Sequence, residues 1–265
     1  MRRWIGIGLC LVLSGCLGTD DYWLTYGGPK PSWDSSIFYG TGIIVADGVV
    51  LTARHVASDC KVIRISAASG AFRAVPATVR AVGPKHDALQ LDVALLAIYF
   101  SAAPAWPAAR FDDSWPDDDE FQNVPKGMSG EVGLSGLRLF GYPGRTVAPH
   151  PAITPVTHLA AVRPDDALQF HLWTFTGDAA HGFSGGPIVD PAGAILGLNF
   201  EGHQAHDPEL AGKVFPNGAL QSDGLGVAVS SKDLVPFLAE NGVSVSSSAP
   251  ARPIEDSLVQ VFCFR

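Results

Sequence analysis

Positive charge and long apolar runs are both scarce in this sequence. Its 18 lysine and arginine residues face 26 acidic ones among 265, so the formal net charge is −8. An acidic chain without a basic cluster lacks the electrostatic footprint of a nucleic-acid binder, and we expect no nucleic-acid partner. The apolar stretch from Trp4 to Leu13 is too short to cross a bilayer.

The N-terminus has the pattern of an export signal. Two arginines precede the apolar stretch, which ends in Leu13-Ser14-Gly15-Cys16. A plain secretory signal would have the first two features, whereas the last four residues resemble the lipobox of bacterial lipoproteins. This resemblance implies a signal peptide over residues 1–15 and acylation of Cys16. It also implies a lipid anchor in the bacterial outer membrane, facing the periplasm or the cell surface, because Leu17 rather than Asp follows the cysteine.

Cysteine is scarce as well, with four residues in the chain. Cys10 would leave with the signal peptide, and Cys16 would carry the lipid. Cys60 and Cys263 then remain as a pair in an oxidising compartment, where disulfides persist. We expect them to form a disulfide that ties the C-terminal segment to the residues just after His55.

Glycine, proline and short apolar runs are abundant. With 29 Gly and 20 Pro, the composition favours many short strands and turns over long helices. Short apolar runs separated by turn residues occupy residues 36–105 and 131–230, with a proline-rich, acidic segment between them. One helix is expected where Ser230 can cap an apolar periodic segment that ends before Gly242.

A single serine lies among glycines in residues 181–189, His-Gly-Phe-Ser-Gly-Gly-Pro-Ile-Val. Such a stretch is either an ordinary Gly/Ser turn or a nucleophile loop, which also needs a base and a pocket of N–H donors. The α/β-hydrolase elbow requires a helix after the serine and a histidine after the acid. Here strand, turn and strand follow Ser184, and the last histidine is His206, so the elbow is excluded.

Candidate partners for Ser184 lie upstream, in the order histidine, aspartate, serine. His55 follows two apolar runs joined by the hairpin turn Asp47-Gly48, and Asp92 opens a third apolar run. Three motifs, Leu-Thr-Ala-Arg-His55, Asp92-Val-Ala-Leu-Leu and Gly-Phe-Ser184-Gly-Gly-Pro, resemble the chymotrypsin/trypsin-like serine proteases. The resemblance covers roughly residues 36–240.

The resemblance implies an all-β fold of two antiparallel six-stranded β-barrels, chymotrypsin-like, with a short C-terminal helix. The expected divisions are a signal peptide (1–15), a tether (16–35), an N-terminal barrel (36–105), a connector (106–130), a C-terminal barrel with the helix (131–243) and a tail (244–265). Apolar residues at 258–262 predict that the tail packs back as an extended segment.

The resemblance also implies the roles of the site residues. His55 would be the general base, Asp92 the carboxylate that orients it, and Ser184 the nucleophile. The N–H groups of Gly182 and Ser184 would form the oxyanion hole. Phe183 departs from the family, which often has Asp or Asn there to pair with a freed N-terminus. We therefore expect no activation by N-terminal insertion.

Substrate contacts are expected from Asp178, Asn199 and Phe200. Asp178 lies six residues before Ser184, where an acid selects basic side chains in trypsin-like relatives, whereas bacterial relatives carry a structural Asp in this loop. The histidines at 181, 203 and 206 fit no standard metal-ligand spacing, and we expect neither a metal nor another cofactor.

Two hypotheses about function follow from these patterns. The first is a serine endopeptidase, anchored to the bacterial envelope, that hydrolyses peptide bonds in protein or peptide substrates. The second is a catalytically inactive protease-fold lipoprotein that acts as a binding module, because Phe183 would distort the donor pocket. The complete set of His55, Asp92 and Ser184 favours the enzyme.

Overall fold

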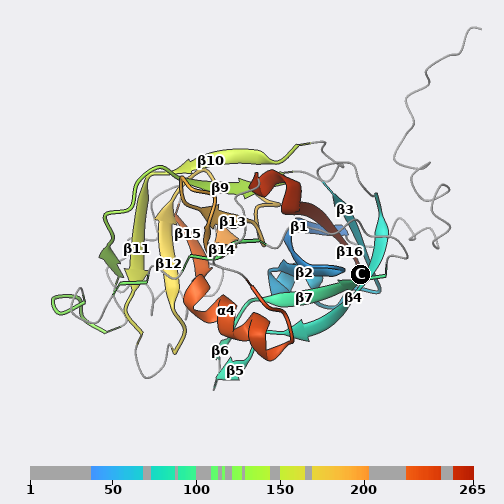
Figure 1. Cartoon of the computed structure of the whole chain (residues 1–265), viewed down its shortest axis with the longest axis horizontal. Helices are drawn as coiled ribbons and strands as arrows, with labels where there is room; N and C mark the ends of the chain where they lie inside the picture. The colour runs from blue at the N-terminus through green and yellow to red at the C-terminus, as the bar shows by residue number, and fades with distance from the viewer. Residues whose placement is uncertain are drawn as a thin grey trace, which may run out of the picture.

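Strands dominate the fold, as the short apolar runs and turn residues predict. A computed structural model of the chain describes residues 37–67, 73–86, 89–99, 109–112, 115–116, 121–126, 129–143, 150–164, 169–202, 225–245 and 253–265. Two antiparallel β units lie side by side, one built mainly from early residues and one from later residues (Figure 1). This is the two-unit architecture that the protease resemblance implies.

The first unit is a closed six-stranded barrel with the order β1-β16-β3-β4-β7-β2. The hairpin at Asp47-Gly48 joins β1 to β2 as predicted, and Gly48 adopts the positive φ of +68° that such a turn requires. The six strands are β1 (Ile37–Ala46), β2 (Val49–Thr52), β3 (Val62–Ala67), β4 (Val75–Val82), β7 (Ala94–Ile98) and β16 (Leu258–Phe264).

The C-terminal strand completes this barrel. β16 pairs antiparallel with β1 on one side and with β3 on the other, so that Cys263 lies opposite both Phe38 and Ile63. All seven residues of β16 are buried. The tail thus packs back in extended form as expected, but the barrel assigned to residues 36–105 contains only five of its own strands and takes the sixth from residues 258–264.

The second unit is an eight-stranded antiparallel sheet, where six strands were expected. Its order is β10-β9-β13-β14-β15-β12-β11-β8, and the additional length comes from short outer strands such as β8 (Ser129–Glu131), which pairs only with β11. The other strands are β9 (Leu137–Gly141), β10 (Ala152–Val156), β11 (His158–Val162), β12 (Leu172–Thr176), β13 (Pro187–Val189), β14 (Ile195–Gly202) and β15 (Leu225–Ser230). A separate two-stranded ribbon consists of β5 (Lys85–His86) and β6 (Leu89–Gln90).

The predicted helix is α4 (Ser231–Glu240), which begins and ends at the expected signals. The Ser230 hydroxyl accepts a hydrogen bond from the Lys232 N–H at 3.2 Å, and Gly242 has φ +71° just past the end. Arg80 of β4 donates to the Asn241 carbonyl at 2.6 Å, which ties the end of α4 to the first barrel (Figure 1). Two short helices, α2 (Arg54–Ala57) and the 3₁₀ helix η2 (Ile254–Ser257), complete the described elements, and no helix among them is both long and apolar enough for a membrane span.

A disulfide joins Cys60 and Cys263, the pairing that the cysteine count predicts. The two Cα atoms are 5.3 Å apart, across a sequence separation of 203 residues. The bond links the segment after α2 to the last residues of β16. It therefore closes almost the whole described chain into one loop.

Replacing both cysteines by serine (C60S/C263S) should lower the free energy of unfolding by about 4–5 kcal/mol, because the disulfide restricts the unfolded chain over a long loop. Urea unfolding followed by tryptophan fluorescence measures the difference. Reductant should destabilise the wild type and leave the double variant unchanged. Two free thiols in protein produced under oxidising conditions would contradict the pairing.

Candidate active site

His55 and Asp92 form a tightly bonded pair on the first barrel. β2 ends at Thr52, and the one-turn helix α2 carries His55 immediately afterwards, while Asp92 lies between β6 and β7. One carboxylate oxygen of Asp92 accepts from the His55 backbone N–H at 2.9 Å, and the other lies 2.6 Å from His55 Nδ1. Because an ionised carboxylate only accepts, Nδ1 carries the proton and Nε2 of the neutral ring is the acceptor.

Ser184 lies on the loop between β12 and β13 of the second unit. This loop contains two residues with positive φ, Gly182 at +100° and Gly185 at +84°. A Cβ on Gly185 would collide with the Thr41 carbonyl and lie 2.9 Å from the Ala53 backbone nitrogen. Glycine at 185 thus allows the serine loop to lie directly against the residues that precede His55.

Thr41 of β1 holds the serine loop against the first barrel. Its backbone N–H donates to the Ser184 carbonyl at 2.8 Å, and its hydroxyl donates to the Gly182 carbonyl at 2.7 Å. The same hydroxyl accepts from the Tyr142 N–H at 2.9 Å, and the Thr52 hydroxyl donates to the Thr41 carbonyl at 2.7 Å. Since Thr52 lies three residues before His55, this network brings the serine loop and His55 to the same corner of the molecule.

Gly182 N–H and Ser184 N–H, which flank Phe183, are the candidate oxyanion donors of the serine loop. Phe183 N–H donates to Ala180, Gly185 N–H to Asn199 and Gly186 N–H to Phe183. Gly182 N–H and Ser184 N–H have no acceptor among the described residues. Nor does the Ser184 hydroxyl bond to His55 within the described part of the chain; such catalytic hydrogen bonds often tighten only when substrate binds.

Residues 40–198 match the family model of the trypsin-like peptidase domain. The chain belongs to this family. It is 27% identical over 211 residues to the serine proteases Rv3671c and MT3772 of Mycobacterium tuberculosis (strains H37Rv and CDC 1551), an overlap covering 73% of this chain and 46% of theirs. The chain thus spans about half the length of these curated relatives.

Two solved protease structures are similar to this chain at 20% sequence identity. The Rv3671c protease in its inactive form has a TM-score of 0.49, with 78% of this chain and 88% of that chain covered. The HtrA-type protease AlgW with a decapeptide has a TM-score of 0.46, with 76% and 51% covered.

Phe183, the residue that departs from the trypsin-like pattern, is a core residue. It is 3% exposed and belongs to a buried cluster with Trp173, Ile188 and others. Its ring lies so close to β9 that a Cβ on Gly141 would be 2.5 Å from it. Apolar packing of Phe183 against the core of the second unit therefore anchors the serine loop.

The three residues expected to bind substrate differ in their placement. Asp178 is exposed in the turn that leads to the serine loop, and Phe200 is half-buried near the end of β14. Asn199 is 1% exposed, and its side-chain amide donates to the Phe183 carbonyl at 3.1 Å. The side chain of Asn199 thus supports the serine loop from inside the protein, because β14 turns it toward the core.

The remaining candidates from the sequence either lie outside the described residues or are not part of a group of metal-ligating side chains. Cys16, His203 and His206 are outside them, and His181 is exposed. No group of three metal-ligating side chains occurs in the described ranges. Sequence reasoning missed Thr41 and Tyr142, although a threonine between two glycines on an otherwise apolar strand marks Thr41 as unusual.

Replacing Thr41 by valine should lower the free energy of unfolding by about 2–4 kcal/mol, because the buried Gly182 carbonyl and Tyr142 N–H each lose a partner. Serine at this position should retain most of the stability, since it keeps the hydroxyl. T52V is the matched control, with one lost bond and a smaller effect. Chemical denaturation of the four proteins gives the comparison, and equal stability of T41V and wild type would refute the bridging role.

Proposed function

We propose that this protein is a serine endopeptidase that uses His55, Asp92 and Ser184 to hydrolyse peptide bonds, and that Cys16 anchors it to the bacterial envelope. The observation that carries the catalytic part is the pair of hydrogen bonds that Asp92 accepts from the backbone N–H and the ring Nδ1 of His55. Membership of the trypsin-like family supports a protease, and therefore protein or peptide substrates.

In the proposed reaction, Ser184 Oγ attacks the carbonyl carbon of the scissile peptide bond while His55 Nε2 takes its proton. Asp92 then faces an imidazolium and stabilises it through Nδ1–H. The negative charge on the substrate oxygen is bound by the N–H groups of Gly182 and Ser184. The imidazolium protonates the leaving amine. Water then attacks the acyl carbon as His55 Nε2 takes its proton, and the bond to Ser184 Oγ breaks as Oγ regains a proton from the imidazolium.

The orientation of the Ser184 N–H supports this assignment. In a trans peptide the N–H points opposite to the carbonyl of the same peptide group. The carbonyl partner of Ser184 N–H belongs to Phe183, and it accepts from Asn199 Nδ2 at 3.1 Å and from Gly186 N–H at 2.8 Å. Two donors on one side fix the peptide plane, so the N–H on the other side is held ready for an oxyanion.

Phe183 is the reason to consider an inactive binding module instead. Its burial beneath Gly141 favours the enzyme, because the ring occupies the core rather than the donor side of the loop. In relatives an acid at this position forms an ion pair with a freed N-terminus, and here burial of Phe183 takes the place of that ion pair. We therefore propose activity without N-terminal cleavage.

Asp178 and Phe200 remain the proposed substrate contacts. Phe200 follows Asn199, whose carbonyl accepts a hydrogen bond from the Gly185 N–H of the serine loop.

A fluorophosphonate probe should label the wild type at Ser184, because it reacts only with a serine activated by a base. S184A should lose both labelling and proteolysis while keeping the wild-type unfolding midpoint. S135A, at an exposed serine away from the loop, is the matched control and should label normally. Mass spectrometry of the labelled peptide locates the adduct. Unchanged cleavage of a test protein by S184A would rule out the proposed nucleophile.

The membrane anchor is proposed from the Leu13-Ser14-Gly15-Cys16 motif. Bacteria that express the full chain should incorporate a labelled fatty acid into it, and the protein should fractionate with the outer membrane. C16S should lose the label and leave the membrane fraction, whereas C10S should behave like the wild type. Acylation that persists in C16S would disprove the assigned position.

A further inference from the structure

The helix that carries His55 cannot hold its own conformation. α2 has four residues, Arg54–Ala57, and its C-cap Ser58 is already extended. A helix of one turn leaves its carbonyls without intrahelical partners, so they need donors from elsewhere. The Ser58 hydroxyl supplies one, to the Arg54 carbonyl at 2.8 Å. The carbonyls of His55 and of the C-cap Ser58 accept hydrogen bonds from outside the helix.

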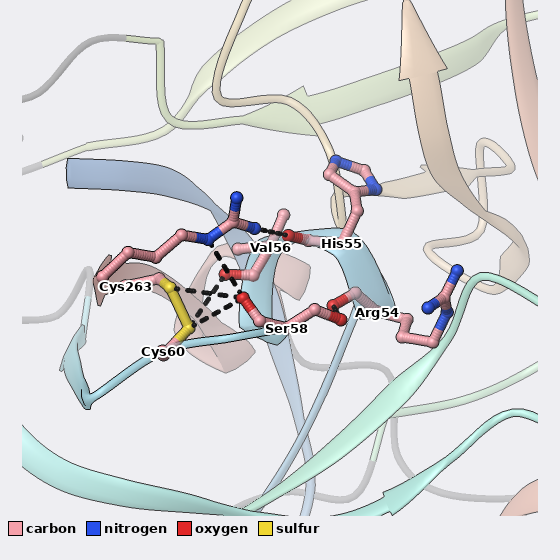
Figure 2. Close-up of a disulfide and its surroundings, with 7 residues drawn as sticks. Arg54, His55, Val56, Ser58, Cys60 and Cys263 are labelled. Atoms are coloured by element: carbon pink, nitrogen blue, oxygen red, sulfur yellow. Dashed lines mark hydrogen bonds between the residues drawn. A yellow bond between two sulfur atoms is a disulfide. The ribbon is translucent and has the colours of Figure 1, made fainter. Parts of the chain in front are cut away.

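Arg265 supplies both of these bonds. Its Nη2 donates to the His55 carbonyl at 3.3 Å, and its Nε donates to the Ser58 carbonyl at 3.1 Å. Both disulfide sulfurs also approach Ser58 O, at 3.5 and 3.8 Å, but they carry no hydrogen and make only contacts (Figure 2). Arg265 is therefore the donor that bridges the two carbonyls.

The guanidinium group of Arg265 is itself held in place. Its central carbon lies 3.8 Å from the centre of the Phe38 ring, which is stacking distance for an arginine on an aromatic face. Phe38 is on β1, and pairing of β1 with β16 sets Phe38 opposite Cys263, two residues before Arg265. This contact gives a physical reason for a phenylalanine that is 40% exposed.

We infer that Arg265 is a positioning residue for His55, an inference that rests on the proposed protease function. His55 is held at its N–H and Nδ1 by Asp92 and at its carbonyl by Arg265. Figure 2 shows the result: the ring of His55 points away from the disulfide, while its backbone faces it. Three fixed polar groups leave Nε2 as the one ring atom available to Ser184.

The inference predicts that R265A lowers kcat and the rate of fluorophosphonate labelling by about 10–100-fold with little change in KM, because a displaced base costs about this much in rate. R265K should be intermediate, since an ammonium group can reach one carbonyl but cannot bridge two and stack. F38L should lower kcat and the labelling rate less than R265A does. All rates are measured far below the unfolding midpoint of each variant.

R138A is the matched control. Arg138 on β9 also lies over an aromatic ring, 5.4 Å from the centre of Phe140, but it belongs to the second unit. It should keep wild-type rates. A wild-type labelling rate in R265A would overturn the inference. If R265A does not fold, R265K and F38L decide in its place, and wild-type rates in both would overturn it equally.

The low-field proton resonance of His55 Nδ1–H separates this inference from the proposed function. It reports the His55–Asp92 bond whether or not Ser184 reacts. A wild type that resists the probe refutes the proposed hydrolase. A resonance that shifts or broadens in R265A, and not in R138A, still supports the positioning role. An unchanged resonance in R265A refutes it.

Discussion

The site depends on one buried hydroxyl that joins two β units. The proposed catalytic site spans both units, with His55 on the segment after β2 of the first barrel and Ser184 on the loop between β12 and β13 of the second sheet. Thr41 is fully buried, and its hydroxyl lies between the Gly182 carbonyl and the Tyr142 N–H. A typical hydrogen bond contributes only about 1 kcal/mol, but an unsatisfied buried partner costs more. The contact between the two units is therefore held chiefly because separating it would leave the buried Gly182 carbonyl and Tyr142 N–H without partners.

The first barrel adds a constraint of sequence distance. β1 and β16 are the first and last described strands, and they are neighbours in the barrel (Figure 1). Closure of so long a loop costs entropy that local contacts cannot repay before the strands meet. The barrel closes only when residues 258–264 have joined it, and the donors to the His55 helix arrive with them. Positioning of His55 therefore depends on the pairing of β16 with β1 and β3.

Features set by residues close in the sequence could be predicted, whereas features set by contacts between distant residues could not. The hairpin at Asp47-Gly48, the cap of α4 and the three site motifs are local patterns, and the structure contains the first two as expected. The insertion of β16 between β1 and β3 was missed, because apolar alternation identifies a strand but not its partners. Asn199 was expected to contact substrate, and the sequence could not show which face of β14 its side chain occupies.

Phe183 illustrates how a departure from a family pattern can preserve geometry. An ion pair with a freed N-terminus makes the loop conditional on cleavage, whereas an apolar side chain finds its partners as the core packs. Burying a phenylalanine contributes about 1.5–3 kcal/mol, and Gly141 leaves the space for its ring. The backbone groups of Phe183 are bonded as well, its N–H to Ala180 and its carbonyl to Asn199 and Gly186. With residue 183 fixed by packing and by its peptide groups, the flanking N–H groups of Gly182 and Ser184 are kept in place by the core itself.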